Sequence, residues 1–128
     1  ILIDCHSMPH EAIENLSHHR GARPEIVLGD RFGAAASADV VDRIEAAFGA
    51  AGLRVARNAP FAGAFVTQHY GRPARHQHVV QVEIDRALYM DEGQVRPNAN
   101  YAAFGDLMRG VVGEIAGIGR RDMPLAAE

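Results

Sequence analysis

The sequence predicts a mixed α/β fold, because short apolar segments with strand character alternate with amphipathic segments of helical period. The best strand is VVQVEI at residues 79–84, in which apolar and polar side chains alternate. The best helix is the segment 104–118, whose apolar residues recur at three- and four-residue intervals. A length of 128 residues suits one domain and is short for two, so we expect residues 1–128 to form a single unit.

The composition is that of a globular protein, with 48% hydrophobic and 23% charged residues. A formal net charge of −3 and scattered Lys and Arg residues argue against nucleic acid or an anionic membrane as a partner. No apolar run approaches membrane-spanning length, and neither a signal peptide nor a transit peptide is visible. Cys5 is the only cysteine, which excludes an internal disulfide and suits a reducing compartment, so we expect a cytoplasmic protein.

Three elements are predicted in the first part of the chain. Residues 1–5 form an apolar strand that ends in the polar turn HSMPHE, which places His6 at the carboxyl end of the strand. This strand starts without a cap or turn, so we expect the chain to lack an N-terminal part of its domain. Residues 11–24 form a connection with at most a short helix, and EIVL at 25–28 is a second strand.

A helix follows, capped at its start by Ser37 and ended by Gly52. Its apolar face consists of Val40, Val41, Ile44, Phe48 and Ala51. Residues 53–56 then form a third strand. The next stretch, of about 20 residues rich in Gly, Pro, Arg and His, is longer than a simple connection, and loops of this length usually carry function. After the strand 79–84, the last helix, which carries Val112 on its apolar face, ends near Gly119.

Asp4 and His6 form the first candidate site. Alternation along a strand places both side chains on one face, at the strand end where open α/β sheets bind ligands. Neutral imidazole is a good zinc ligand, and a neighbouring carboxylate commonly orients a ligating histidine through its second nitrogen. The alternative is that His6 only caps a turn.

Glu83 is the second candidate, because a carboxylate inside an apolar strand is costly to bury unless it has a partner or a catalytic task. Burial would raise its pKa toward the range that suits general acid/base catalysis, and a nearby metal would oppose that rise. The alternative is a strand with one wet face, on which Gln81, Glu83 and Asp85 are simply solvated.

The long loop supplies many hydrogen-bond donors, which suit an anionic substrate or a developing oxyanion. They are His69, Tyr70, Arg72, Arg75, His76 and His78. His76 and His78 would alternatively form a metal pair. Arg31, in the turn GDRFG, either binds a carboxylate or is an ordinary surface residue.

Cys5 is a poor candidate nucleophile. If His6 points into the site, alternation directs Cys5 into the core, where it would be an inert small hydrophobe. The sequence contains no GxSxG elbow, phosphate loop or dinucleotide fingerprint.

Four segments occur in an order that resembles a known family. They are LIDCHSMP, GDRFG, AGAFVTQHYGRP and VQVEIDRALYMDE, and together they resemble the C-terminal portion of the N-formylglutamate amidohydrolase family over residues 1–92. The histidine of DxHS and a later glutamate in an apolar strand are more distantly similar to zinc carboxypeptidases. The resemblance implies a three-layer α/β sandwich with a mixed sheet, of the zinc-carboxypeptidase and phosphorylase/hydrolase-like type, whose N-terminal part is missing from this chain.

The resemblance also implies a zinc enzyme that hydrolyses N-formyl-L-glutamate, or a related N-acyl amino acid, to formate and the free amino acid. In it, His6 matches the last metal ligand, and Glu83 matches the glutamate that activates metal-bound water and passes its proton to the leaving amine. The resemblance further implies contacts with the substrate or oxyanion from His69, Tyr70, Arg72 and His78, and a contact with the substrate carboxylates from Arg31.

Two departures from the family pattern qualify these expectations. The loop has PFAGAF where the family more often shows an aromatic residue followed by two glycines near Ala64, which affects acyl-group preference. The family's upstream histidine motif and acidic ligand do not occur in this chain, and a catalytic zinc needs about three protein ligands. We therefore expect the remaining ligands outside the chain, no activity from the chain alone, and association through an open sheet edge.

Two other interpretations remain open from the sequence. One is a carboxypeptidase-like or other N-acyl amino acid hydrolase, which shares the zinc chemistry but has another substrate. The other is a noncatalytic binding domain that kept the sheet and lost the metal.

Overall fold

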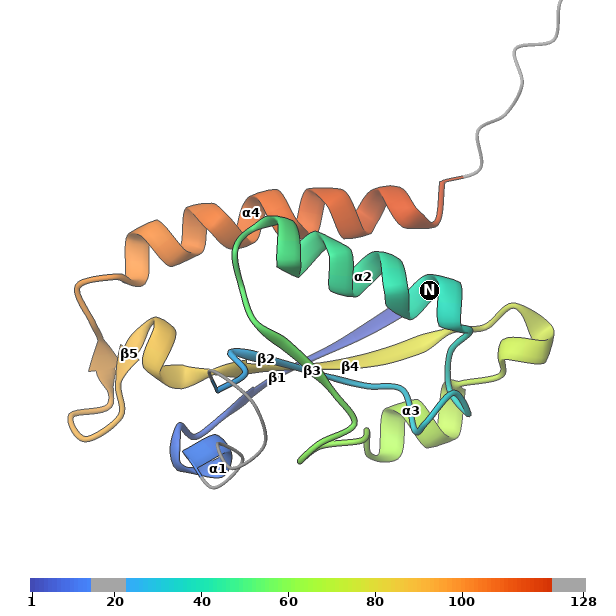
Figure 1. Cartoon of the computed structure of the whole chain (residues 1–128), viewed down its shortest axis with the longest axis horizontal. Helices are drawn as coiled ribbons and strands as arrows, with labels where there is room; N and C mark the ends of the chain where they lie inside the picture. The colour runs from blue at the N-terminus through green and yellow to red at the C-terminus, as the bar shows by residue number, and fades with distance from the viewer. Residues whose placement is uncertain (15–22, 121–128) are drawn as a thin grey trace, which may run out of the picture.

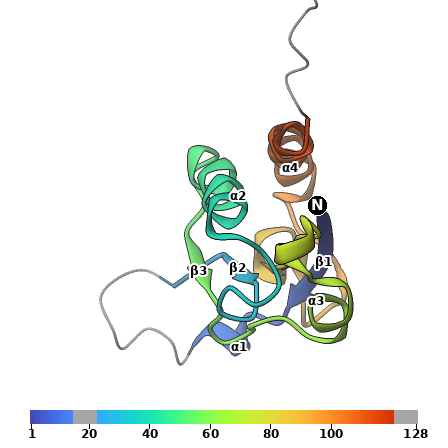
Figure 2. The same ribbon diagram turned by 90° about the vertical axis from the view of Figure 1, so that its right-hand side faces the viewer.

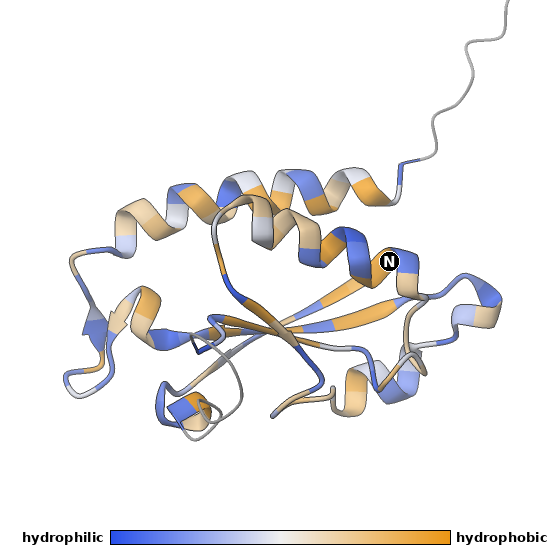
Figure 3. Cartoon of the chain, in the orientation of Figure 1, coloured by the Kyte–Doolittle hydropathy of each residue, from blue (hydrophilic) through white to orange (hydrophobic). Residues whose placement is uncertain are grey.

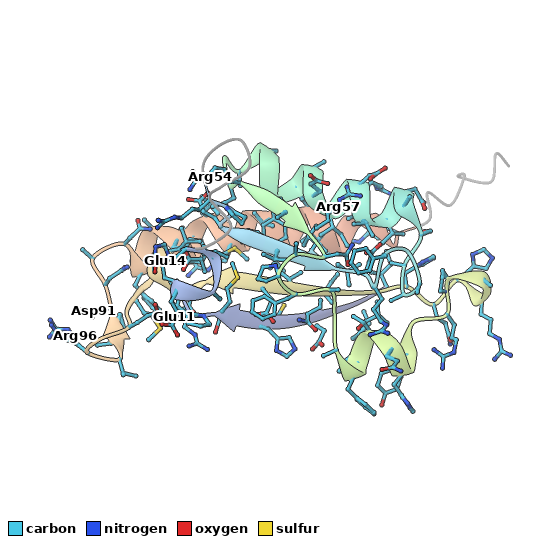
Figure 4. All side chains as sticks on the ribbon, turned by 60° about the horizontal axis from the view of Figure 1, so that its bottom comes forward. Glu11, Glu14, Arg54, Arg57, Asp91 and Arg96 are labelled. Atoms are coloured by element: carbon cyan, nitrogen blue, oxygen red, sulfur yellow. The ribbon has the colours of Figure 1, made fainter. Side chains whose placement is uncertain are left out.

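The computed structural model describes residues 1–14 and 23–120, and the part of the chain that it describes contains a four-stranded mixed sheet of order β1-β4-β2-β3. The strands are β1 (Leu2–Met8), β2 (Ile26–Gly29), β3 (Val55–Arg57) and β4 (Val79–Asp85). β4 runs parallel to β1 and antiparallel to β2, and β2 runs parallel to β3. The four strands lie side by side in Figure 4, with β1 and β3 at the two edges.

Helices lie on both faces of this sheet. α2 (Ala38–Ala50) and α4 (Tyr101–Ile118) pack side by side over one face, whereas α1 (Glu11–Glu14) and α3 (Phe65–Tyr70) lie on the other (Figures 1 and 2). The prediction of a mixed α/β fold with a mixed sheet is therefore confirmed.

The main core lies between the sheet and the α2/α4 layer. Phe48 and Ile44 of α2 are almost completely buried against the strands, and Figure 3 shows hydrophobic segments in the strands that lie beneath α2 and α4. The other buried members of this cluster are Ile26, Leu28, Ala36, Val40, Val41, Val80, Val82 and Val111. A smaller cluster of Met8, Ile13 and Val27 holds α1 on the opposite face. The strand faces are thus assigned, since Val80 and Val82 point to α2 and α4.

Smaller elements complete the described chain. A two-stranded hairpin joins β5 (Met90–Asp91) to β6 (Arg96–Pro97), and Figure 4 labels Asp91 and Arg96 where it projects from the molecule. Short 3-10 helices cover Pro73–Arg75 and Arg86–Leu88. Within the described ranges, no helix is long and apolar enough to cross a membrane.

Several predicted boundaries were wrong. The first strand continues through His6 to Met8, because pairing with β4 holds the polar residues that we assigned to a turn. β3 begins at Val55, two residues later than predicted. The long loop contains the helix α3, which lacks the apolar repeat that signals a helix in the sequence. Of the predicted connection 11–24, residues 11–14 form α1, and the part at 15–22 lies outside the described residues.

Two details of the helices also differ from prediction. Ser37 occupies the N-cap position of α2, but its side chain makes no capping hydrogen bond. Its backbone N–H instead donates to Nδ1 of His78 over 3.2 Å. Val112, which we placed on the apolar face of the last helix, is 58% exposed. Gly52 does follow the end of α2, with a positive φ of 83°.

Candidate active site

The register between β1 and β4 brings the two principal candidates together. His6 lies opposite Glu83, and Asp4 lies opposite Gln81. Because Val80 and Val82 point to α2 and α4, alternation directs these four side chains to the face that carries α1 and α3. Two residues far apart in the sequence, His6 and Glu83, therefore face the same side of adjacent strands.

His6 pairs with Asp4 on this face, as the alternation predicted. Its Nε2 lies 3.0 Å from Oδ2 of Asp4, and the imidazole is 45% exposed. A carboxylate on Nε2 fixes the tautomer and leaves the lone pair of Nδ1 available to a metal. The arrangement suits one histidine ligand.

Glu83 is only 7% exposed, so the interpretation of a wet strand face is wrong. Gln81 donates from Nε2 to Oε1 of Glu83 over 2.9 Å, and Gln81 accepts in turn from the backbone N–H of Ala64 over 3.0 Å. Burial raises the pKa of the Glu83 carboxyl, while the positive potential of His6, the Gln81 hydrogen bond and the charge of Arg86 act in the opposite direction. A buried carboxyl with a raised pKa suits proton transfer.

A second imidazole–carboxylate pair lies at the carboxyl end of the two strands and was missed in the sequence. Nδ1 of His10 lies 2.8 Å from Oδ2 of Asp85, whose other oxygen accepts from the backbone N–H of Ala87. The backbone N–H of His10 donates to Glu92 over 3.1 Å. The alternation along β4 already placed Asp85 on the same face as Glu83, which could have marked it as a site residue. The contact with His10 could not be predicted, because it depends on the pairing of β1 with β4.

The loop candidates gather at the other end of β1. His69, Tyr70, Arg72 and His78 line one pocket of about 390 Å³ that also borders Leu2. The ring of His69 stacks on Phe65 at 5.0 Å and meets Tyr70 edge-on at 4.6 Å. His6 and Glu83 do not line this pocket. Six of the predicted site residues thus fall into two groups, four around this pocket and two, His6 and Glu83, opposite each other on β1 and β4.

Arg31 lies in a tight turn after β2, apart from both groups. Asn58 holds this turn, because it donates to Oδ1 of Asp30 over 2.7 Å and accepts from the backbone N–H of Asp30 over 3.1 Å. Arg31 has a positive φ of 55°, and its backbone N–H donates to Ala62 over 2.8 Å. The turn therefore ties β2 to the loop that also binds Gln81.

Two further sequence hypotheses concern Cys5 and a complete set of metal ligands. Cys5 is on the face opposite His6 as predicted, but it is exposed and not in the core, because β1 is an edge strand. Burial of part of its surface, followed by the charge of Asp4, raises the pKa of its thiol, which disfavours a nucleophilic thiolate. No group of three or more His, Cys, Asp or Glu side chains that could hold a metal occurs among residues 1–14 and 23–120.

The site thus combines a mixed sheet with a buried glutamate that lies opposite a histidine on the adjacent strand. Comparison with protein families shows that the model of the N-formylglutamate amidohydrolase family matches residues 1–90. The chain belongs to the N-formylglutamate amidohydrolase family.

Individual relatives support this assignment. The chain is 36% identical over 96 residues to N-formylglutamate deformylase of Pseudomonas aeruginosa, a match that covers 74% of this chain and 35% of the relative. It is 36% identical over 73 residues to the deformylase of Pseudomonas putida, which covers 56% of this chain and 27% of the relative. The crystal structure of N-formylglutamate amidohydrolase from Ralstonia eutropha JMP134 superposes with a TM-score of 0.75 at 35% identity, covering 88% of this chain and 40% of that one. The chain thus spans about a third of the length of the deformylases that it matches.

Proposed function

We propose that this chain carries the acid/base residue and one metal ligand of an enzyme that hydrolyses N-formyl-L-glutamate. The observation that carries the proposal is the position of Glu83, which is buried on β4 directly opposite His6 and has a raised pKa. Glu83 accepts a proton from the attacking water as the water oxygen bonds to the formyl carbon. It then donates that proton to the amide nitrogen as the C–N bond breaks, which yields formate and glutamate.

His6 is the proposed metal ligand, through Nδ1, with Asp4 orienting the ring from the other side. Zinc bound there would supply Lewis acidity toward the carbonyl oxygen and toward water. The described residues offer no complete set of ligands, so the others belong to polypeptide outside them. For that reason the chain alone is proposed to be inactive. We further propose that it is the C-terminal portion of a carboxypeptidase-like catalytic domain, and that the enzyme is cytoplasmic.

The pocket beside α3 is the proposed binding place for the substrate carboxylates. Arg72 lines it together with His69, Tyr70 and His78, and none of its lining residues is acidic. Leu2, at the pocket, precedes His6 by four residues of β1, or about 13 Å along an extended strand. A long side chain such as Arg72 would reach from the pocket part of the way toward His6, and a bound substrate would span the rest. Arg31 would contribute only if the loop at Ala62 brought its guanidinium over this face.

The test compares zinc content with hydrolysis of N-formyl-L-glutamate in a polypeptide of full family length that contains this chain. His6→Ala is expected to lose zinc and activity together. Glu83→Gln is expected to keep zinc and lose kcat by about 10²-fold or more. His76→Ala is the comparison for zinc content alone, because His76 is an exposed histidine that lines the substrate pocket and is not a proposed ligand, so this variant should keep zinc.

Other outcomes would reject the proposal in distinct ways. If His76→Ala lost zinc and His6→Ala retained it, the metal site would be assigned to the loop histidines instead of His6. Full activity of Glu83→Gln would remove its acid/base role. A panel of N-acyl amino acids on the same wild-type protein decides between deformylation and another acyl preference, since residues 62–64 differ from the family pattern.

A further inference from the structure

Gln81 lies between Glu83 and the loop that precedes α3. Gln81 and Glu83 share one face of β4, and Gln81 is only 4% exposed, so the described chain itself buries this contact. Nε2 of Gln81 donates to Oε1 of Glu83 over 2.9 Å, and Oε1 of Gln81 accepts from the backbone N–H of Ala64 over 3.0 Å. We propose that Gln81 is a positioning residue, which holds Oε1 of Glu83 so that Oε2 exchanges the proton during hydrolysis. The role of Gln81 rests on the proposed function, in which Glu83 is the acid/base residue.

The hydrogen bonds of Gln81 allow one orientation of its amide. A backbone N–H can only donate, so Ala64 requires the carbonyl oxygen of Gln81. The NH₂ group must then face Glu83, whose ionised carboxylate can only accept. Turning the amide over would place N–H against N–H and oxygen against oxygen, which loses both bonds. The donor to Glu83 is therefore fixed by the backbone of the loop.

The two carboxylate oxygens of Glu83 differ in their surroundings. Oε1 accepts the hydrogen bond from Gln81, whereas the described chain offers Oε2 no hydrogen-bond partner. Within residues 1–14 and 23–120, no buried side-chain nitrogen or oxygen lacks a partner, so Oε2 keeps contact with solvent. A general base must lie within hydrogen-bond reach of the water that it deprotonates. Oε2 is therefore the oxygen of Glu83 that the described chain leaves accessible to such a water.

Gln81 is the one hydrogen-bond donor that the described chain provides to the carboxylate of Glu83. The neighbour of Glu83 on β2 is Val27, which is apolar and completely buried, and its neighbour on β1 is His6, the proposed metal ligand. The last torsion of a glutamate side chain is broad and nearly twofold, so a carboxylate without a hydrogen bond can rotate. Rotation would exchange Oε1 with Oε2 and turn either one away from the water. A charge-assisted bond from Gln81 restricts this motion more than a neutral hydrogen bond does.

Gln81 also links Glu83 to α3. Ala64 is the N-cap residue of α3, and its carbonyl accepts from the hydroxyl of Thr67 over 2.8 Å, which secures the first turn of the helix. His69 of the same helix lines the pocket proposed for the substrate carboxylates. A displacement of α3 would therefore move the anchor of Gln81 together with this pocket. The contact of Gln81 with the loop affects substrate binding, whereas its contact with Glu83 affects the chemical step, and the two effects can be measured separately.

The test measures kcat and KM for N-formyl-L-glutamate in a polypeptide of full family length, with zinc content and circular dichroism as checks of the fold. Gln81→Met fills a similar volume without the amide, and its kcat should fall by about 10-fold or more, because a hydrogen bond to a charged group is lost. Thr67→Val is the matched control, because it weakens the same loop at Ala64 and leaves the bond from Gln81 to Glu83 intact. Its kcat should stay within about twofold of wild type, and KM should change about equally in both variants.

A double-mutant cycle shows whether Gln81 acts through Glu83. In a Glu83→Gln background, Gln81→Met should lower kcat by less than about twofold, since the carboxylate that Gln81 positions is already gone. Gln81→Glu has an unchanged shape and decides the matter where Gln81→Met fails to fold. It still accepts from Ala64 but cannot donate to an ionised Glu83, so its kcat should also fall by about 10-fold or more.

Two kinds of result would overturn the role of Gln81, and they differ from a failure of the proposed function. Wild-type kcat in a folded Gln81→Met or Gln81→Glu variant would show that Glu83 needs no positioning by this amide. Full additivity in the cycle, or an equal loss of kcat in Thr67→Val, would assign the effect of Gln81 to the loop. Full activity of Glu83→Gln alone would instead overturn the proposed function, and the role of Gln81 with it.

Discussion

Gly29, on β2 opposite Gln81, gives the sharpest test of how the fold supports the candidate site. A Cβ at this position would lie 2.5 Å from the nitrogen of Gly63 and 2.7 Å from the carbonyl carbon of Ala62. Both are backbone atoms, so the clash cannot be relieved by turning a side chain. Gly29→Ala must therefore displace the loop from β2.

The expected cost combines two effects. Overpacking a buried position costs about 1–3 kcal/mol. The displaced loop also carries the hydrogen bonds from Arg31 N–H to Ala62 and from Ala64 N–H to Gln81, each worth about 1 kcal/mol. If one of them is lost, the total is about 2–4 kcal/mol, which for a chain of 128 residues lowers Tm by roughly 7–15 °C.

Urea denaturation at one fixed protein concentration measures this cost, because self-association would otherwise change the apparent stability. Gly113→Ala is the control. Gly113 lies within α4 with nothing within 4 Å of an added Cβ, so this change should stabilise the chain by about 0.5–1 kcal/mol. A Gly29→Ala variant within 0.5 kcal/mol of wild type, about the usual effect of a neutral surface change, would show that the loop is not held against β2.

Two further predictions concern charged groups. Burial raises the pKa of Glu83, so the folded metal-free chain binds a proton more tightly than the unfolded chain, and its stability falls as pH rises through the folded pKa. Glu83→Gln removes this loss and should be more stable than wild type at pH 8 but not at pH 4; equal urea midpoints at pH 8 would contradict the pKa shift. Arg57, labelled in Figure 4, pairs with Asp42 and Glu45 of α2 and is 35% exposed, so Arg57→Ala should cost only about 0.5–1 kcal/mol. That cost should shrink in 1 M salt, and a cost that is independent of salt would assign it to packing of the side chain.

The strands and long helices could be predicted because their hydrophobic period is strong. VVQVEI became β4 with one further residue, and the last predicted helix became α4 with its start three residues earlier. α3 has no such signal, since Thr67 is its only buried residue and Gly63 and Gly71 flank it. It is held by tertiary contact instead, as a Cβ on Gly71 would lie 2.7 Å from Cα of Ala35. A single-sequence pattern does not contain that kind of information.

The same distinction explains the site. Alternation correctly placed Asp4 with His6, but it could not show whether the polar face of β4 is wet or buried. That depends on tertiary contacts, among them the loop before α3, which brings Ala64 to Gln81, the hydrogen-bond partner of the buried Glu83. Alternation also gave the correct face for Cys5, but the predicted burial failed because the sequence does not reveal which strand lies at an edge.

Because β1 lies at that edge, His6 is more sensitive than Glu83 to polypeptide that packs beside the sheet. Glu83 lies on β4, between β1 and β2, and Gln81 fixes its carboxylate from within the described chain. His6 lies on the edge strand, and within the described chain only Asp4 is within bonding distance of its imidazole. Any polypeptide that pairs with β1 would therefore change the surroundings of His6 directly and those of Glu83 only through His6. Metal affinity should accordingly depend on what pairs with β1, whereas the burial that raises the pKa of Glu83 comes from within the described chain.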